Sequence, residues 1–147
     1  MPRKIRAPWL APGLIQAPSV PDKENIVFSF SFFQADHSKC NASGRDANYF
    51  RALLQRFKAV GQFTVKQFRT MHAGYNKALR VHPIEWSHPK ISQAGFQIPQ
   101  RQDLDEQAWQ FSLSEHESGR VHGFLIDRVF HVVWLDPDHN LYPWEAR

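Results

Sequence analysis

The sequence predicts an α+β fold: a strand, two helices, and then a three- to four-stranded antiparallel meander sheet with the helices packed on one face. Apolar residues alternate with polar ones near the start of the chain, recur at helical spacing in its middle, and alternate again in three segments near its end. The chain of 147 residues has the length of one ordinary domain, and its hydrophobic content of 42% is enough to bury a core.

The composition restricts the class of protein. The single cysteine, Cys40, excludes an internal disulfide, and no Cys/His quartet is present for a structural zinc site, so we expect a reducing, cytoplasmic location and no cofactor. No segment approaches the roughly 20 apolar residues of a membrane helix, and prolines interrupt residues 1–19, so we expect neither a membrane location nor a secretory signal. The formal net charge of +4 suits a polyanionic partner such as RNA.

The first part of the chain contains an arm and a strand. Residues 1–24 combine prolines with basic side chains, which predicts a flexible, proline-rich arm, followed by a single α+β domain over residues 25–147. An arm that docks on a partner through apolar side chains is the alternative. In residues 25–34 a period of two predicts the opening strand: one set of alternate positions is Ile26, Phe28, Phe30 and Phe32, and the other is Val27, Ser29, Ser31 and Phe33.

The middle of the chain predicts two helices and an irregular segment. Residues 45–60 carry apolar side chains at helical spacing before Gly61, which predicts a helix that ends at this glycine. Thr64 and Gln67 have the spacing of a capping box, and apolar residues continue at helical spacing to Leu79, which predicts a second helix. Prolines throughout residues 81–107 predict an irregular excursion, with one short strand expected near residues 95–98.

Three alternating segments close the chain. Residues 109–113, 120–126 and 129–135 are separated by turn residues, which predicts a three-stranded meander. A two-residue turn at Asp127 and Arg128 would pair Ile126 with Val129 and set the register of the remaining pairs. One face would then carry the apolar pairs Leu125–Phe130, Gly123–Val132 and Val121–Trp134. The other would carry Phe124–His131, His122–Val133 and Arg120–Leu135.

The second of these faces is where we expect function. Imidazoles can take and give protons near neutrality, and a guanidinium can hold a phosphate with two donors. A solvated sheet surface without a functional role is the alternative. The segment after the sheet returns His139 and Tyr142 to the edge of this face, while Asp136 and Asn140 are expected to cap a turn.

Two further groups have alternative interpretations. Asp136, Asp138, His139 and His131 have ligand types that suit a metal, but their spacing matches no recognised motif. Cys40 lies in a polar loop without an adjacent histidine motif, and we interpret it as incidental.

Residues 109–142 resemble the C-terminal part of the RelE/YoeB-like bacterial toxins, small endoribonucleases that cut messenger RNA, typically on the ribosome. The matching segments are Trp109-Gln110-Phe111-Ser112-Leu113, Gly119-Arg120-Val121-His122-Gly123-Phe124, Phe130-His131-Val132-Val133-Trp134 and His139-Asn140-Leu141-Tyr142. The order of a strand, two helices and a meander is also that of this family. The end of the chain is similar, too, to bacterial proteins of unassigned function.

The resemblance implies metal-independent cleavage in which the 2′-hydroxyl of RNA attacks the adjacent phosphate. Arg120 takes the family's arginine position on the middle strand, and His139 and Tyr142 stand for its closing His-Tyr pair, here separated by two residues. His122 and His131 are further candidates for proton transfer. The expected partners are RNA or the ribosome and an antitoxin protein.

Other roles remain open. Phe124, Tyr142 and Arg128 are candidates for RNA binding, because aromatic rings stack on bases and cations attract the backbone. The family's catalytic carboxylate precedes the meander, where this chain offers Glu85, Asp103, Asp105 and Glu106. A non-catalytic nucleic-acid- or protein-binding module and a metal-dependent nuclease are the alternative functions.

Overall fold

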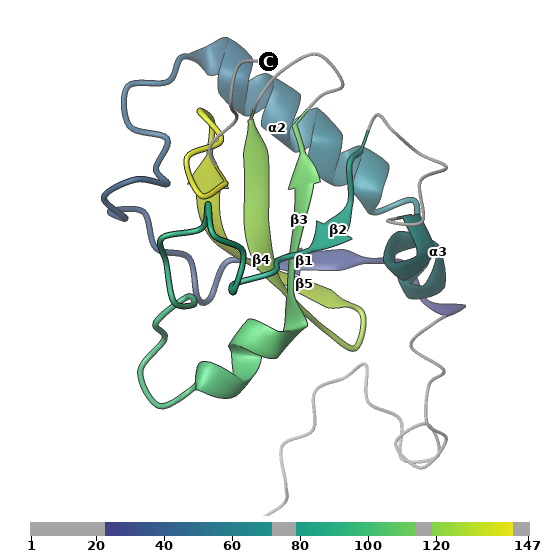
Figure 1. Cartoon of the computed structure of the whole chain (residues 1–147). Helices are drawn as coiled ribbons and strands as arrows, with labels where there is room; N and C mark the ends of the chain where they lie inside the picture. Colours follow the sequence, from purple (N-terminus) through teal and green to yellow (C-terminus); the bar gives the residue numbers. More distant parts are fainter. Residues whose placement is uncertain (1–22, 72–78, 114–118, 143–147) are drawn as a thin grey trace, which may run out of the picture.

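A computed structural model describes residues 23–71, 79–113 and 119–142, so nearly all of the predicted arm lies outside the described residues. In order, the elements are β1 (Val27–Ser29), α2 (Ala47–Val60), α3 (Val65–Thr70), β2 (His82–Pro83), the 3₁₀ helix η3 (Gln102–Gln107), β3 (Ala108–Ser112), β4 (Arg120–Ile126) and β5 (Val129–Asp136). The described strands form one five-stranded sheet in the order β1-β5-β4-β3-β2 (Figure 1). No described helix is both long and apolar enough to span a membrane.

The α+β class is confirmed, but the expectation of an antiparallel sheet is wrong. The predicted meander is present as β3, β4 and β5, which pair antiparallel, whereas β1 pairs parallel with β5. Parallel strands need a long crossover connection, and the chain between β1 and β5 supplies one that includes α2 and α3. The sheet is therefore mixed.

The first helix and the start of the second agree with their predictions. α2 begins after Asp46, whose side chain accepts a hydrogen bond from the Tyr49 N–H, and it ends at Gly61. At the start of α3, the Gln67 N–H donates to Thr64 Oγ1 over 3.2 Å and the Thr64 N–H donates to Gln67 Oε1 over 2.9 Å. This is the expected capping box.

Three boundaries differ from the predictions. β1 has three residues rather than ten, because the chain turns at Phe30 and meets β5 again only where the Gln34 N–H donates to the Val133 carbonyl over 2.9 Å. α3 ends at Thr70, and most of the predicted continuation to Leu79 falls in residues 72–78, outside the described residues. Residues 95–98 form no strand; the irregular segment instead contributes β2 and η3.

A β-bulge changes the register halfway along the β4–β5 hairpin. Near the turn, Leu125 pairs with Phe130 and Gly123 with Val132, as predicted. Beyond Gly123, β5 contains one extra residue, so His122 pairs with Trp134 rather than Val133. The same shift places Asp136, and not Leu135, opposite Arg120.

Both faces of the sheet are buried, which corrects the expectation that one face is open to solvent. α2 and α3 cover the face that carries Phe111, Val121 and Phe130. Segments with little regular structure cover the other face. The proline-rich segment 81–107 supplies many of their apolar side chains, and these form a second core. This core contains Cys40, Ile84, Ile91, Phe96, Ile98, Leu104, Ala108, Phe124, Val133, Trp134 and Leu141.

Candidate active site

A pocket of about 320 Å³ lies on the face of the sheet opposite α2 and α3. Strands β2, β3 and β4 and the segment after β5 all contribute to its wall, so residues distant in sequence meet there. Its lining consists of Arg80, His82, Pro83, Ile84, Glu85, Ile91, Gln110, Arg120, His139 and Tyr142. The pocket therefore combines cationic, titratable and apolar groups.

Two guanidinium groups make the pocket attractive to anions. Arg80 is exposed, whereas Arg120 is only 7% exposed and donates from Nη1 to the Gly119 carbonyl over 3.0 Å. Burial, assisted by the charge of Arg80, lowers the pKa of Arg120 to about 10, while Asp136 opposes this shift. Arg120 therefore remains a cation at neutral pH, in a setting where water screens its charge poorly.

His82 is held by hydrogen bonds at both ring nitrogens. Its Nδ1 lies 3.0 Å from the Pro83 carbonyl, which can only accept, so Nδ1 carries a proton. Its Nε2 lies 2.6 Å from Nε2 of Gln110. Burial lowers the pKa of His82, and the charge of Arg120 lowers it further. A neutral ring that accepts from Gln110 satisfies all of these contacts.

His139 differs from His82 because its Nε2 has no hydrogen-bond partner among the described residues. Its backbone adopts φ 58° and its N–H donates to the Asp136 carbonyl over 3.2 Å, which places the ring in the pocket wall. Nε2 is buried and makes no hydrogen bond within the described part of the chain. Burial, followed by the charge of Arg120, lowers the pKa of His139 to about 4.

Tyr142 carries the hydroxyl group of the pocket. Its oxygen lies 2.6 Å from Nε2 of His88, whose Nδ1 accepts the Lys90 N–H over 3.1 Å. Since Nδ1 is an acceptor, the proton of a neutral His88 ring sits on Nε2 and points at the tyrosine oxygen. The hydroxyl hydrogen of Tyr142 is then available to a ligand.

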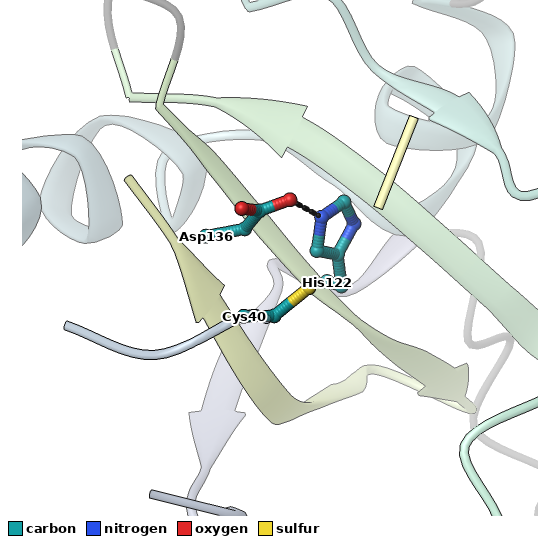
Figure 2. Close-up of side chains that lie close together, drawn as sticks. All are labelled: Cys40, His122 and Asp136. Carbon is teal, nitrogen blue, oxygen red and sulfur yellow. Dashed lines mark hydrogen bonds and ion pairs between the residues drawn. The ribbon is translucent and has the colours of Figure 1, made fainter. Parts of the chain in front are cut away.

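A buried polar centre lies behind the pocket (Figure 2). Nε2 of His122 lies 2.9 Å from Oδ2 of Asp136. Asp136 also accepts the N–H groups of Asn140 at 2.7 Å and Leu141 at 2.9 Å. Burial acts to raise the pKa of Asp136, but His122 and these two N–H groups together bring it below its ordinary value. Asp136 thereby anchors the segment that carries His139 and Tyr142.

Cys40 adjoins this centre, which was not expected of a residue interpreted as incidental. The side chain is fully buried, and burial followed by the charge and hydrogen bonding of Asp136 raises the pKa of its thiol. A thiol in this environment stays protonated, so Cys40 is unsuited to act as a nucleophile.

The structure separates the candidate residues into groups. Arg120, His139 and Tyr142 meet in the pocket, and His122 lies behind it with no exposed surface. Phe124 is also fully buried, and its ring stacks on His131 at 4.7 Å between centroids.

Of the remaining candidates, only Glu85 is among the residues that line the pocket. Arg128 is at the β4–β5 turn and donates to the Asn25 carbonyl over 3.0 Å. Asp138, which the alternative metal interpretation included, pairs with Arg45. Of the four candidate carboxylates, Glu85 lines the pocket.

Some pocket residues had no signal in the sequence. Arg80 and His82 belong to no motif, and His82 lies in the proline-rich segment 81–107, where no periodicity indicates which way a side chain points. Gln110 is on a strand that was predicted, and its position on the face of His122 follows once the β3–β4 pairing is known. The β3–β4 pairing is therefore the one feature from which the position of Gln110 could have been predicted.

Comparisons with models of protein families, with curated proteins and with solved structures found no match to this chain.

Proposed function

We propose that this protein is a toxin-like endoribonuclease that cleaves messenger RNA by metal-independent acid–base chemistry, with its active site in the pocket. The observation that carries the proposal is that Arg80, Arg120, the His139 imidazole and the Tyr142 hydroxyl group line one cavity, with Nε2 of His139 lacking a hydrogen-bond partner among the described residues. The order of a strand, two helices and a meander, which is one of the grounds for the resemblance to the RelE/YoeB-like toxins, adds support.

The two arginines would bind the scissile phosphate. A guanidinium offers paired donors to phosphate oxygens, and its attraction strengthens where water is excluded. Arg120 is the more buried of the two, so it would act most strongly on the charge that develops at phosphorus. Arg80, at the exposed side of the same pocket, would guide the RNA backbone to it.

His139 and Tyr142 would move the protons. The His139 imidazole, whose buried Nε2 makes no hydrogen bond to the described residues, would take the proton of the RNA 2′-hydroxyl once bound substrate brings the two groups into contact. The 2′-oxygen would then bond to phosphorus while the bond to the 5′-oxygen breaks, and Tyr142 would give its hydroxyl proton to that leaving oxygen. The products would be a 2′,3′-cyclic phosphate and a free 5′-hydroxyl.

A non-catalytic binding module at the same pocket is a second candidate. His82 is engaged at both nitrogens, which leaves His139 as the pocket imidazole with an open nitrogen among the described residues. A pocket built only to bind an anion needs the two arginines but no proton transfer, so the engagement of both His82 nitrogens favours binding without cleavage.

Cleavage of RNA by the purified protein tests the proposal. Wild type should cut single-stranded RNA, free or on ribosomes, in the presence of a chelator, and it should leave intact an RNA with a 2′-deoxy sugar at the cleavage site. Arg80→Asn and His139→Asn should each lower the rate by about a hundredfold. Asparagine is chosen because both positions have positive φ, which asparagine tolerates.

Arg101→Asn is the matched control, since Arg101 is exposed, pairs with Asp103 and lies outside the pocket. Circular dichroism would verify that each variant is folded. RNA that is bound but stays whole would identify a binding module, and cleavage that requires added magnesium or manganese would identify a metal-dependent nuclease. A wild type that neither binds nor cuts RNA would refute the proposed function and its first alternative together.

A further inference from the structure

Three segments that are far apart in sequence bring metal-ligating side chains together in the second core. Cys40 comes from the connection between β1 and α2, His122 from the middle of β4, and Asp136 from the end of β5 (Figure 2). None of the three has exposed surface. One ligand atom from each side chain lies within 4.8 Å of the other two, and these three residues are the one such group among the described residues.

The geometry points to a metal site formed by Cys40, His122 and Asp136, with zinc as the ion that suits it best. Thiolate sulfur, imidazole nitrogen and carboxylate oxygen are the three side-chain ligands that zinc uses in proteins, and softer or harder ions match this mixture less well. The ion would join the loop around Cys40 to strands β4 and β5, which carry His122 and Asp136.

The observed distances are close to those that an ion requires. Ligand atoms at about 2.0–2.3 Å from a tetrahedral ion are roughly 3.2–3.8 Å apart. The distance of 2.9 Å between Nε2 of His122 and Oδ2 of Asp136 would lengthen slightly. The Cys40 sulfur lies within 4.8 Å of a ligand atom of each of these residues and would move closer to both. The N–H groups of Asn140 and Leu141 already orient the carboxylate, as groups around metal ligands commonly do.

Binding would exchange protons for the ion. The Cys40 thiol would lose its proton to solvent, and the proton of a neutral His122 ring would sit on Nδ1, so that Nε2, which now bonds to Asp136, could coordinate the ion. The thiolate and the carboxylate would together balance the double positive charge. A water molecule would complete four-coordination.

The site is separate from the proposed active site, because none of the three ligands lines the pocket. Its ion would take no part in RNA cleavage. It would instead hold the segment that carries His139 and Tyr142, since Asp136 anchors that segment through Asn140 and Leu141. A failure to bind metal would therefore not contradict the proposed ribonuclease activity, and a failure to cut RNA would not contradict the metal site.

Cobalt titration of metal-free protein is the direct test. Cys40 is the only cysteine in the chain, so a sulfur-to-cobalt charge-transfer band can arise from this residue alone. Wild type should develop the band to saturation at one ion per chain, zinc should abolish it by competition, and zinc should raise the melting temperature. Cys40→Ser, which keeps a hydrogen-bonding group beside Asp136, should lose the band and the zinc-dependent rise in melting temperature.

A folded wild type that gives no charge-transfer band, or that melts at the same temperature with and without zinc, would overturn the proposal. Equal zinc stabilisation of wild type and Cys40→Ser would also overturn it, because the ion would then bind elsewhere. If Cys40→Ser fails to fold, the wild-type band and its competition by zinc still decide the question.

Discussion

Single residues in this protein owe their chemistry to the contacts that surround them. His82 and His139 are both imidazoles of one pocket, yet hydrogen bonds occupy both nitrogens of His82 and leave Nε2 of His139 open. Burial lowers the pKa of each ring, so both favour the neutral form. Residue type alone would assign them the same role, whereas their hydrogen bonds assign them different ones.

Gly123 is the residue whose replacement the hairpin should tolerate least. A Cβ at this position would lie 2.1 Å from the His131 carbonyl oxygen and 2.6 Å from the Phe130 ring, and both belong to the paired strand. Gly123→Ala should therefore destabilise the protein by about 3 kcal/mol or more, measured by urea unfolding. Gly44→Asn is the control, because no atom lies within 4 Å of a Cβ there and asparagine tolerates its positive φ. A loss below about 1 kcal/mol for Gly123→Ala would contradict the close packing.

At the level of elements, the bulge in β5 places the polar side chains behind the pocket. Without the extra residue, Arg120 would face Leu135 and His122 would face Val133, as the strict two-residue register predicts. With it, Asp136 lies opposite Arg120 and bonds to His122. A bulge thus converts an apolar end of the hairpin into a polar one, which agrees with the frequent occurrence of bulges near functional sites.

The start of α3 allows a test of element stability. Thr64→Ala should cost about 1 kcal/mol of folding free energy, because the Gln67 N–H would lose its acceptor at the helix terminus. Thr64→Ser keeps the hydroxyl group and should retain most of that stability. Chemical denaturation of both variants measures the difference, and equal losses would show that the hydroxyl does not stabilise the helix.

At the scale of the whole molecule, the sheet separates two cores. Helices cover one face in the usual way, while the other is covered by chain with little regular structure, including η3. This second layer forms one side of the pocket and encloses the Cys40–His122–Asp136 centre. Its integrity therefore matters to both proposed sites.

The second core can be tested by comparing two phenylalanines. Phe96→Ala should destabilise the protein by about 3–5 kcal/mol, because its ring is 1% exposed and packs against Trp86 and Trp134. Phe30→Ala should cost about 1 kcal/mol or less, since half of that residue is exposed. Thermal or urea unfolding gives both values. Similar small losses for the two variants would mean that this face of the sheet is not buried.

Local signals were sufficient for the parts of the fold that arise from neighbouring residues. Helical spacing and Gly61 located the first helix, Thr64 and Gln67 marked the start of the second, and alternation located the three strands of the meander. For the site, they indicated Arg120, His139 and Tyr142, which share the pocket. Capping, periodicity and a tight turn act over a few residues, so they can be recognised without the fold.

The bulge, the parallel edge strand, the second core and the rest of the pocket depend on contacts between distant segments. Gln110 meets His82 across 28 positions of sequence, and the Gln34 side chain accepts from the Trp134 indole across 100. Alternation predicts which side chains share a face of the sheet, but it does not predict what packs against that face. Burial decides whether an imidazole on the sheet is solvated or enclosed, and it is set only when the whole chain packs.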